Sequence, residues 1–245
     1  MVSEPLEGIF RSLRIYHGDR PREAAMDALY ARFLKPDDLA FDIGSHVGDR
    51  ISSFRRLGAR AVGLEPQPLA HRALRLIHGR DANVSLIQAA CGAQAGSVTL
   101  HVNSANPTVS TASRAFVEAA DGAGGWDGQV WDQSFEVPCL TLDALVASHG
   151  EPQFVKIDVE GFEADVLAGL SRPVAALSFE FTTIQRDVAY ECLARLDGLG
   201  SYRFNIALGE SQVLQFDGHV SAGEMRAHIA ELPHEANSGD VYAVL

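Results

Sequence analysis

The stretch 39–54, LAFDIGSHVGDRISSF, decides the fold of this chain. Its apolar beginning, Leu39–Ile43, predicts a buried strand, and the turn that follows contains two glycines, Gly44 and Gly48. A helical pattern then starts at Ile51. A strand, a glycine turn and a helix in this order are typical of an α/β sheet that binds its ligand at the carboxyl ends of the strands. We therefore expect an α/β protein with a doubly wound sheet.

A carboxylate at the end of the first strand, Asp42, indicates which ligand the turn would hold. A dinucleotide site places a pyrophosphate against such a turn, and Asp42 would repel that anion. S-adenosylmethionine carries a sulfonium and an ammonium group there and has no phosphate. We therefore predict that Asp42, Gly44, Ser45, His46 and Gly48 bind this cofactor. Asp42 could also accept hydrogen bonds from the loop amides, and the two roles overlap.

A second acid, Glu65, ends the next apolar segment. It follows Asp42 by roughly 20 residues, the distance at which a nucleoside-binding α/β fold places the acceptor for the ribose hydroxyls. The alternative is that Glu65 only caps the helix that starts at Pro68. We expect ribose binding. The further residues expected to contact the cofactor are Pro66 and Gln67 next to the ribose, and Gln88, Ala89 and Ala90 at the adenine edge after the third strand.

Length and composition limit the possible classes. With 245 residues the chain can bury one large core, and we expect a single domain over 1–245. The longest apolar runs are far shorter than the roughly 20 residues of a membrane helix, so no membrane partner is expected. A net charge of −12 without a block of Lys or Arg argues against nucleic acid. No basic-then-apolar signal segment opens the chain, so we expect a cytoplasmic protein with reduced, buried cysteines.

Strand and helix patterns alternate along most of the chain, which indicates a parallel sheet. Strands are expected at 39–43, 61–64, 84–87, 154–157, 175–181, 201–207 and 241–245. Helices are expected at 21–33, within an N-terminal helical segment 1–35, and at 51–57, 68–78, 141–148, 162–170 and 188–196. The segments 97–102 and 135–140 lie outside the alternation and are expected to form a side ribbon at the edge of the sheet.

The segment 103–134 is rich in Ser, Ala and Gly and shows little periodicity apart from 113–120. A segment this long inside a compact domain is usually a functional lid or a disordered insertion. Its two tryptophans, Trp126 and Trp131, favour the lid, because disordered segments tend to lack aromatic residues. The alternative is that both tryptophans merely anchor the loop to the core.

Three acids, Asp158, Glu160 and Glu163, follow the strand expected at 154–157, at the edge of the sheet where ligands bind. They could form a metal cage, a general base with its neighbours, or the acidic start of a helix, which suits Glu163 best. Glu180 ends the next strand and is expected beside Asp158. Two adjacent carboxylates raise the proton affinity of one of them, which suits a general base. Because no histidine lies nearby in the sequence, we expect no metal.

Lys156 is an unusual residue for a buried parallel strand. The two-residue period of a strand places it on the same face as Asp158. It could form a structural ion pair with Asp158 or Glu180, or it could hold the substrate oxygen, and both alternatives remain open. We count Lys156 with Asp158, Glu160 and Glu180 as candidate catalytic residues.

The string KIDVEGFE at 156–163, read with Asp42-Ile43-Gly44 and Glu65-Pro66-Gln67-Pro68, resembles the FkbM family of S-adenosylmethionine-dependent methyltransferases. Further matches are Gln88-Ala89-Ala90 with Gly92, Leu140-Thr141-Leu142-Asp143, Glu180, and Gly239-Asp240-Val241-Tyr242. The resemblance runs from about 36 to 245. It implies a Rossmann-like class I methyltransferase fold, with a seven-stranded, mostly parallel sheet and helices on both faces.

The resemblance also implies the chemistry, which is methyl transfer, typically to a hydroxyl group of a sugar or polyketide-like small molecule. One departure concerns the turn, where the family usually has Ala-Asn and this chain has Ser45-His46. Two other classes of function remain as alternatives. An NAD-dependent oxidoreductase would need the third glycine of G-x-G-x-x-G, which is absent, and a non-catalytic nucleoside-binding module would keep the fold without the reaction.

Overall fold

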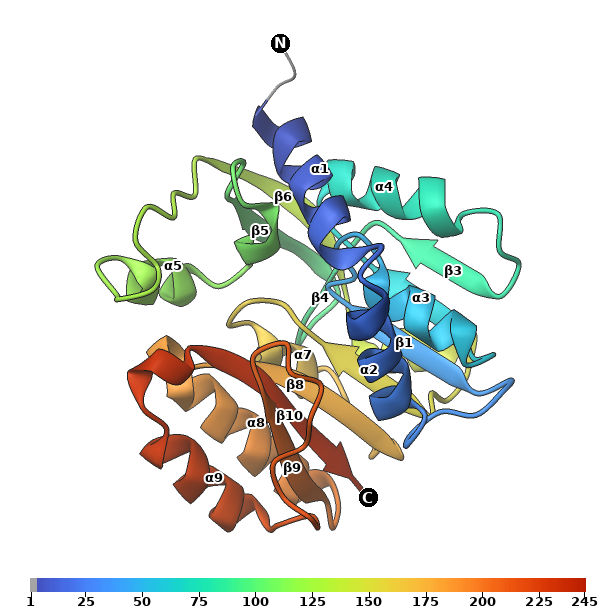
Figure 1. The fold of residues 1–245 in the computed structure, drawn as a ribbon, viewed down its shortest axis with the longest axis vertical. Helices are drawn as coiled ribbons and strands as arrows, with labels where there is room; N and C mark the ends of the chain where they lie inside the picture. Colours follow the sequence, from blue (N-terminus) through green and yellow to red (C-terminus); the bar gives the residue numbers. More distant parts are fainter. Residues whose placement is uncertain (1–3) are drawn as a thin grey trace.

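The computed structural model describes residues 4–245 and is built around one seven-stranded sheet (Figure 1). The spatial order of its strands is β3 (Val84–Ile87), β2 (Arg60–Leu64), β1 (Leu39–Ile43), β7 (Phe154–Ile157), β8 (Ala176–Thr182), β10 (Ser238–Val244) and β9 (Arg203–Leu208). Strand β10 runs antiparallel to β8 and β9, and the other neighbouring strands of this sheet pair in parallel. The expected α/β fold, with a seven-stranded and mostly parallel sheet, is confirmed.

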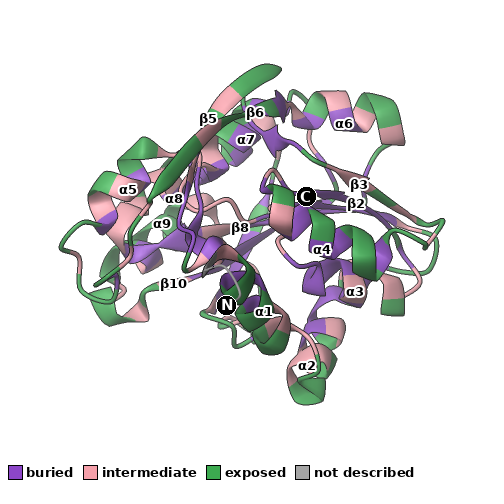
Figure 2. Ribbon diagram, turned by 90° about the horizontal axis from the view of Figure 1, so that it is seen from above, coloured by how far each residue is buried: buried purple, intermediate pink, exposed green. Residues whose placement is uncertain are grey.

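Helices cover both faces of this sheet, as the doubly wound expectation requires. One face carries α2 (Arg20–Tyr30), α3 (Asp49–Arg56) and α4 (Pro68–His78), and the other carries α6 (Leu142–His149), α7 (Glu163–Ala168), α8 (Arg186–Leu199) and α9 (Ala222–Glu231). Figure 2 shows α4 and α6 on opposite sides of the buried strands, with their outer surfaces exposed. Helix α1 (Glu4–Tyr16) packs against α4. Among the described residues, no helix combines the length and apolar character needed to cross a bilayer.

Strand periodicity decides which side chains reach which face. In β1, Leu39, Phe41 and Ile43 pack toward α6, α7, α8 and α9, whereas Ala40 packs toward α2 and α3. Strand β7 pairs with β1 in register, so that Asp42 lies beside Lys156. These two polar residues therefore share the face of the sheet that α2 and α3 cover.

A second sheet of three strands lies beside the main one, in the order β4 (Ala90–Cys91), β6 (Gln133–Leu140) and β5 (Gly96–Val102). Strands β5 and β6 form the expected side ribbon, and the short β4 extends it. Within 103–134 the structure places η1 (Pro107–Val109) and α5 (Arg114–Ala120). Trp126 and Trp131 both meet Phe116 edge to face, with ring centroids 5.0 and 6.2 Å apart, so this segment has an apolar cluster of its own.

Some elements differ from the sequence-based expectation. Helix α9 was not expected, although Ser221 and Glu224 form a capping box at its start. Only Met225 and Ile229 are buried on it, which leaves a weak apolar periodicity. Strand β10 begins at Ser238 rather than at 241. The expectation left out Asp240 because it is polar, but this residue is buried in the strand and forms an ion pair with a lysine on β7. The structure also contains two short 3-10 helices, η2 (Thr183–Gln185) and η3 (His234–Ala236).

Candidate functional site

A cavity lies at the carboxyl ends of β1, β2, β7 and β8, with an empty volume of about 990 Å³ that includes its open mouth. Most of the residues predicted from the sequence line it. They are Asp42, Gly44, Ser45, His46, Glu65, Pro66, Gln67, Ala89, Ala90, Asp158, Glu160 and Glu180. Seven lining residues carry a carboxyl group, whereas Arg50 is the one lysine or arginine among the described residues that line the cavity. Such a cavity favours a cationic ligand.

The glycine turn after β1 brings the backbone close to β7. Gly44 has a φ of 85°, and a Cβ at this position would overlap the carbonyl oxygen of Asp158. Gly48 is the N-cap of α3 with a φ of 83°, and it shapes the turn without lining the cavity. His46 also has a positive φ, of 46°, which is unusual for a residue with a side chain. This conformation places Gly44, Ser45 and His46 at the surface of the cavity.

Asp42 is the most deeply buried acid of the cavity, with 1% of its surface exposed. Neither of its carboxylate oxygens has a hydrogen-bond partner among the described residues. Burial, and to a smaller degree the charge of Asp49, raises the pKa of Asp42 to about 7. Because a buried carboxylate without a partner is costly, Asp42 is prepared for a cation or a hydrogen-bond donor from a ligand.

Glu65 follows β2 and is held by two backbone amides. Its Oε2 accepts a hydrogen bond from the amide of His46 at 2.9 Å, and its Oε1 accepts one from the amide of Gln67 at 2.8 Å. Burial raises its pKa to about 7, against the effect of these two hydrogen bonds. Gln67 is the N-cap of α4, so Glu65 also contacts the start of this helix, in line with the alternative role as a helix cap. Each carboxylate oxygen keeps a lone pair for a ligand.

The third group of predicted cofactor contacts divides in two. Ala89 and Ala90 are buried and line the cavity, whereas Gln88 is exposed and lies in a separate surface depression beside α4. Gln67 connects the cavity to the segment 103–134, because its Nε2 donates to the carbonyl of Pro107 at 2.9 Å. The structure therefore does not bring Gln88 to the site.

The acids that follow β7 and the acid Glu180 within β8 come together as expected. One carboxylate oxygen from each of Asp158, Glu160 and Glu180 lies within 4.8 Å of the others. Glu160 has a φ of 56°, and its carbonyl accepts a hydrogen bond from the Thr111 hydroxyl at 2.7 Å. Glu163 is outside this cluster, where it accepts hydrogen bonds from the amides of the turn before α7. Oxygen ligands of this kind could hold a divalent cation. Our expectation of no metal stays a prediction.

Lys156 is fully buried and does not line the cavity. Its Nζ donates to Asp158 Oδ2 at 3.0 Å, to Asp240 Oδ1 at 2.7 Å and, more weakly, to the carbonyl of Ile157 at 3.4 Å. An ammonium group has three N–H donors, so all are used. This geometry favours the ion-pair alternative over contact with a substrate, with Asp158 and not Glu180 as the partner. The second partner, Asp240, was not predicted.

The three acids of the cluster differ in proton affinity. Burial opposes ionisation of Asp158, but the charges of Lys156 and Arg50 together with hydrogen bonds outweigh it and lower the pKa of Asp158. Burial and the neighbouring carboxylates of Glu160 and Asp158 raise the pKa of Glu180 well above its usual range. The pKa of Glu160 is raised as well, by burial and by the carboxylates of Asp158 and Glu163. Glu180 Oε2 is buried and has no hydrogen-bond partner among the described residues. Asp158 is thus a stable anion, and Glu180 is the better proton acceptor.

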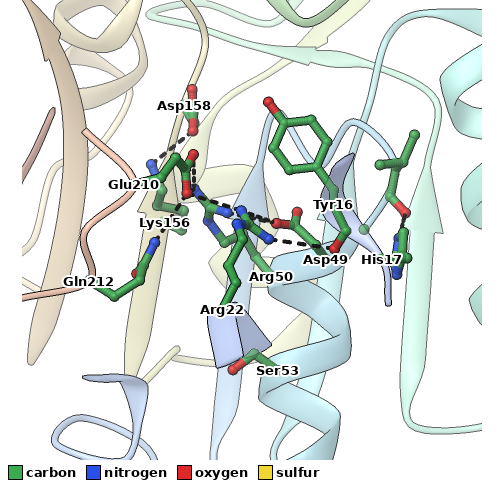
Figure 3. A network of polar contacts seen from close by, with 12 residues as sticks. Tyr16, His17, Arg22, Asp49, Arg50, Ser53, Lys156, Asp158, Glu210 and Gln212 are labelled. Carbon is green, nitrogen blue, oxygen red and sulfur yellow. Dashed lines mark hydrogen bonds and ion pairs between the residues drawn. The ribbon is translucent and has the colours of Figure 1, made fainter. Parts of the chain in front are cut away.

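Tyr16, Asp49, Arg50 and Glu210 also line the cavity and were not predicted as site residues. Figure 3 shows them as one polar network with Arg22 of α2. Asp49 and Arg50 directly follow the turn glycine Gly48, but the sequence pattern did not mark them as site residues. No local signal marked Tyr16 or Glu210, because they reach the cavity from α1 and from the segment after β9. The Tyr16 and His46 rings pack edge to face, with their centroids 5.9 Å apart. Burial lowers the pKa of His46 to about 4, so this histidine is neutral.

Comparison with known proteins adds independent information. Residues 42–232 match the family described as the methyltransferase FkbM domain. Similar folds occur in a TehB-like SAM-dependent methyltransferase from Corynebacterium glutamicum, with 10% identity, 96% of this chain and 93% of that chain covered, and a TM-score of 0.49. The O-methyltransferase from Bacillus cereus in complex with SAH is 11% identical over 100% of this chain and 92% of that chain, with a TM-score of 0.45. No curated protein matches this chain in sequence.

Proposed function

Because this chain belongs to the methyltransferase FkbM domain family, and is thus an S-adenosylmethionine-dependent methyltransferase, we propose that it methylates a hydroxyl group of a small molecule. A sugar or a polyketide-like compound is the proposed acceptor class. The observation that carries this proposal is the presence, in one cavity, of an unpartnered carboxylate at Asp42 and a cluster of acids at Asp158, Glu160 and Glu180. The first fits the donor, and the second fits an acceptor that loses a proton.

The residues present fit the donor. The carboxylate of Asp42 has free oxygens for a cationic group, and the acidic lining as a whole favours a sulfonium over a phosphate. Glu65 would accept hydrogen bonds from the ribose hydroxyls, and Ala89 and Ala90 would contact the adenine. Gly48 would act through the shape of the turn. When bound, S-adenosylmethionine supplies the methyl group and a neutral thioether as leaving group.

The acids would receive the acceptor. As the bond between the acceptor oxygen and the methyl carbon forms and the sulfur–carbon bond breaks, the hydroxyl proton would pass to the carboxylate of Glu180. Asp158, held ionised by Lys156, would keep the acceptor end of the cavity negative. Alignment supplies most of the acceleration in such a displacement, about 7–11 kcal/mol, and a general base adds about 10²–10⁴-fold. Lys156 would act only through Asp158.

The test is a turnover assay with a panel of hydroxyl acceptors, monosaccharides and macrolide aglycones, in which S-adenosylhomocysteine formation is measured. We expect turnover with at least one member and a product that carries a methyl ether, as detected by NMR. For the variant Glu180→Gln, the exposed Glu191 on α8 offers a control, because Glu191→Gln removes the same charge from a residue that does not line the cavity. Methyl transfer to nitrogen or carbon only, with no hydroxyl acceptor used, would contradict the proposal.

A further inference from the structure

Two arginines meet beside the glycine turn, and one of them, Arg50, lines the cavity. Arg50 lies in the first turn of α3, and Arg22 lies in the first turn of α2. Their side chains are only 10% and 13% exposed. Both donate to the same oxygen, Asp49 Oδ2, at 2.7 and 2.8 Å. Asp49 therefore balances one of the two positive charges. The second charge requires another anion.

Glu210 supplies that anion from a distant part of the chain. Its Oε2 accepts from Arg22 at 3.0 Å and its Oε1 accepts from Arg50 at 3.2 Å. Unlike Asp49, it is half-exposed, with 51% of its side chain open to solvent. It lies in the turn after β9, between Gly209 at a φ of 52° and Gln212 at a φ of 56°. Figure 3 shows its side chain directed from this turn toward the arginines.

The position of Glu210 in the fold connects it with the cofactor. The sheet order places β2, which carries Glu65, on one side of β1, and places β7, β8, β10 and β9 on the other side. If the ribose binds at Glu65, as proposed above, the residues on the Asp42 side of β1 would hold the amino-acid end of the cofactor. Arg50, Asp49 and Glu210 line the cavity on this side. The amino-acid end of S-adenosylmethionine carries a carboxylate as well as an ammonium group.

We propose that Arg50, which lines the cavity, and Arg22, which shares the anions Asp49 and Glu210 with it, form a carboxylate-binding subsite at the edge of the cavity. Glu210 fills this subsite in the ligand-free protein and leaves it when a ligand carboxylate arrives. Exchange of one carboxylate for another keeps the charges balanced, whereas both together would set three carboxylates against two arginines. A half-exposed ion pair is weak, so it can be replaced by a ligand. The two sources of such a group are the α-carboxylate of the cofactor and an acidic acceptor.

The first experiment compares S-adenosylmethionine with decarboxylated S-adenosylmethionine by calorimetry, in the full chain and without acceptor. Glu210→Gln removes the internal competitor and should tighten S-adenosylmethionine binding about three- to tenfold, with no effect on the decarboxylated compound. Arg22→Gln should weaken S-adenosylmethionine about tenfold and again spare the decarboxylated compound. Asp217→Asn is the matched control, because this exposed acid lies between the same strand and helix without touching an arginine.

A second experiment identifies an acidic acceptor as the source. The Glu210→Gln protein is saturated with S-adenosylmethionine, and its melting temperature is measured in acetate and in chloride at equal ionic strength. A rise in acetate that disappears in the Glu210→Gln, Arg22→Gln double variant supports the subsite and assigns it to the acceptor. If Glu210→Gln changes neither the preference between the two donors nor the response to acetate, the subsite does not exist. Melting curves without ligand verify that each variant is folded.

Discussion

Lys156 Nζ lies 3.0 Å from Asp158 Oδ2, and the lysine side chain is completely buried while the aspartate reaches the cavity. This ion pair connects the interior of the sheet with the acids that would face the acceptor. Asp240 completes it from β10, across β8. The buried Lys156 therefore stabilises the ionised form of Asp158 in the folded protein.

Replacement of Lys156 by methionine should strongly destabilise the protein. The substitution leaves Asp158 and Asp240 without their cation, and breaking a buried ion pair in this way costs about 3–5 kcal/mol. Urea unfolding measures the free energy change, with Lys35→Met as the control at an exposed lysine. A loss of activity with unchanged stability would assign Lys156 to the substrate and contradict the ion-pair role.

The affinity for S-adenosylmethionine should depend on pH through Asp42. Its pKa is raised to about 7, so Asp42 is neutral below this pH and negative above it. A cationic ligand prefers the ionised form, and the dissociation constant should therefore fall as the pH rises from 6 to 8, with release of protons on binding. Calorimetry in buffers of different ionisation enthalpy measures both. The dependence should become much weaker in Asp42→Asn, and an equal dependence in that variant would exclude Asp42 as its origin.

Glu65→Ala should weaken binding of the donor more than it slows the reaction at saturating donor. A contact with the ribose is made equally in the ground state and the transition state, so its loss raises KM and leaves kcat nearly constant. Steady-state kinetics with varied S-adenosylmethionine separates the two constants. An unchanged KM combined with a collapsed kcat would show that Glu65 has a different role.

Glu180→Gln should lower kcat by about 10²–10⁴-fold while S-adenosylhomocysteine still binds, because the amide cannot accept the proton. Asp158→Asn removes a charge from the same cluster and is the matched comparison. If the cluster instead holds a cation, EDTA should inactivate the wild-type enzyme and Mg²⁺ should restore it. Full activity in both variants, with no effect of the chelator, would mean that alignment alone drives the reaction.

The segment 103–134 is proposed to close over the acceptor. Its residues Thr108, Ser110 and Ala112 line the cavity, and its tryptophans pack on Phe116 within the segment rather than on the main core. The fluorescence of Trp126 and Trp131 should therefore change when donor and acceptor bind together. Kinetics of a protein in which a short glycine linker replaces 112–131 provide the second measurement. Unaltered acceptor kinetics in that protein would count against a lid.

The sequence predicted those parts of the site that depend on local pattern. The apolar period of β1, the glycines after it and the acids at two strand ends indicate that Asp42, Glu65 and Asp158 meet in one cavity, as they do, because parallel strands bring their carboxyl ends to one edge. Contacts between distant segments carried no such signal. Glu210 reaches Arg50 across 160 residues of chain, and Asp240 reaches Lys156 across 84. Gln88 was misplaced because the chain leaves β3 with this side chain directed to solvent.

Titration calorimetry of the purified protein with S-adenosylhomocysteine and NAD shows whether the cavity at Asp42 and Glu65 binds S-adenosylmethionine. We expect micromolar affinity for S-adenosylhomocysteine, about −8 kcal/mol, and at least a tenfold loss in Glu65→Ala. NAD should not bind, because Asp42 faces the place of its pyrophosphate. An absence of heat with S-adenosylhomocysteine and S-adenosylmethionine, together with tight binding of NAD, would contradict the account.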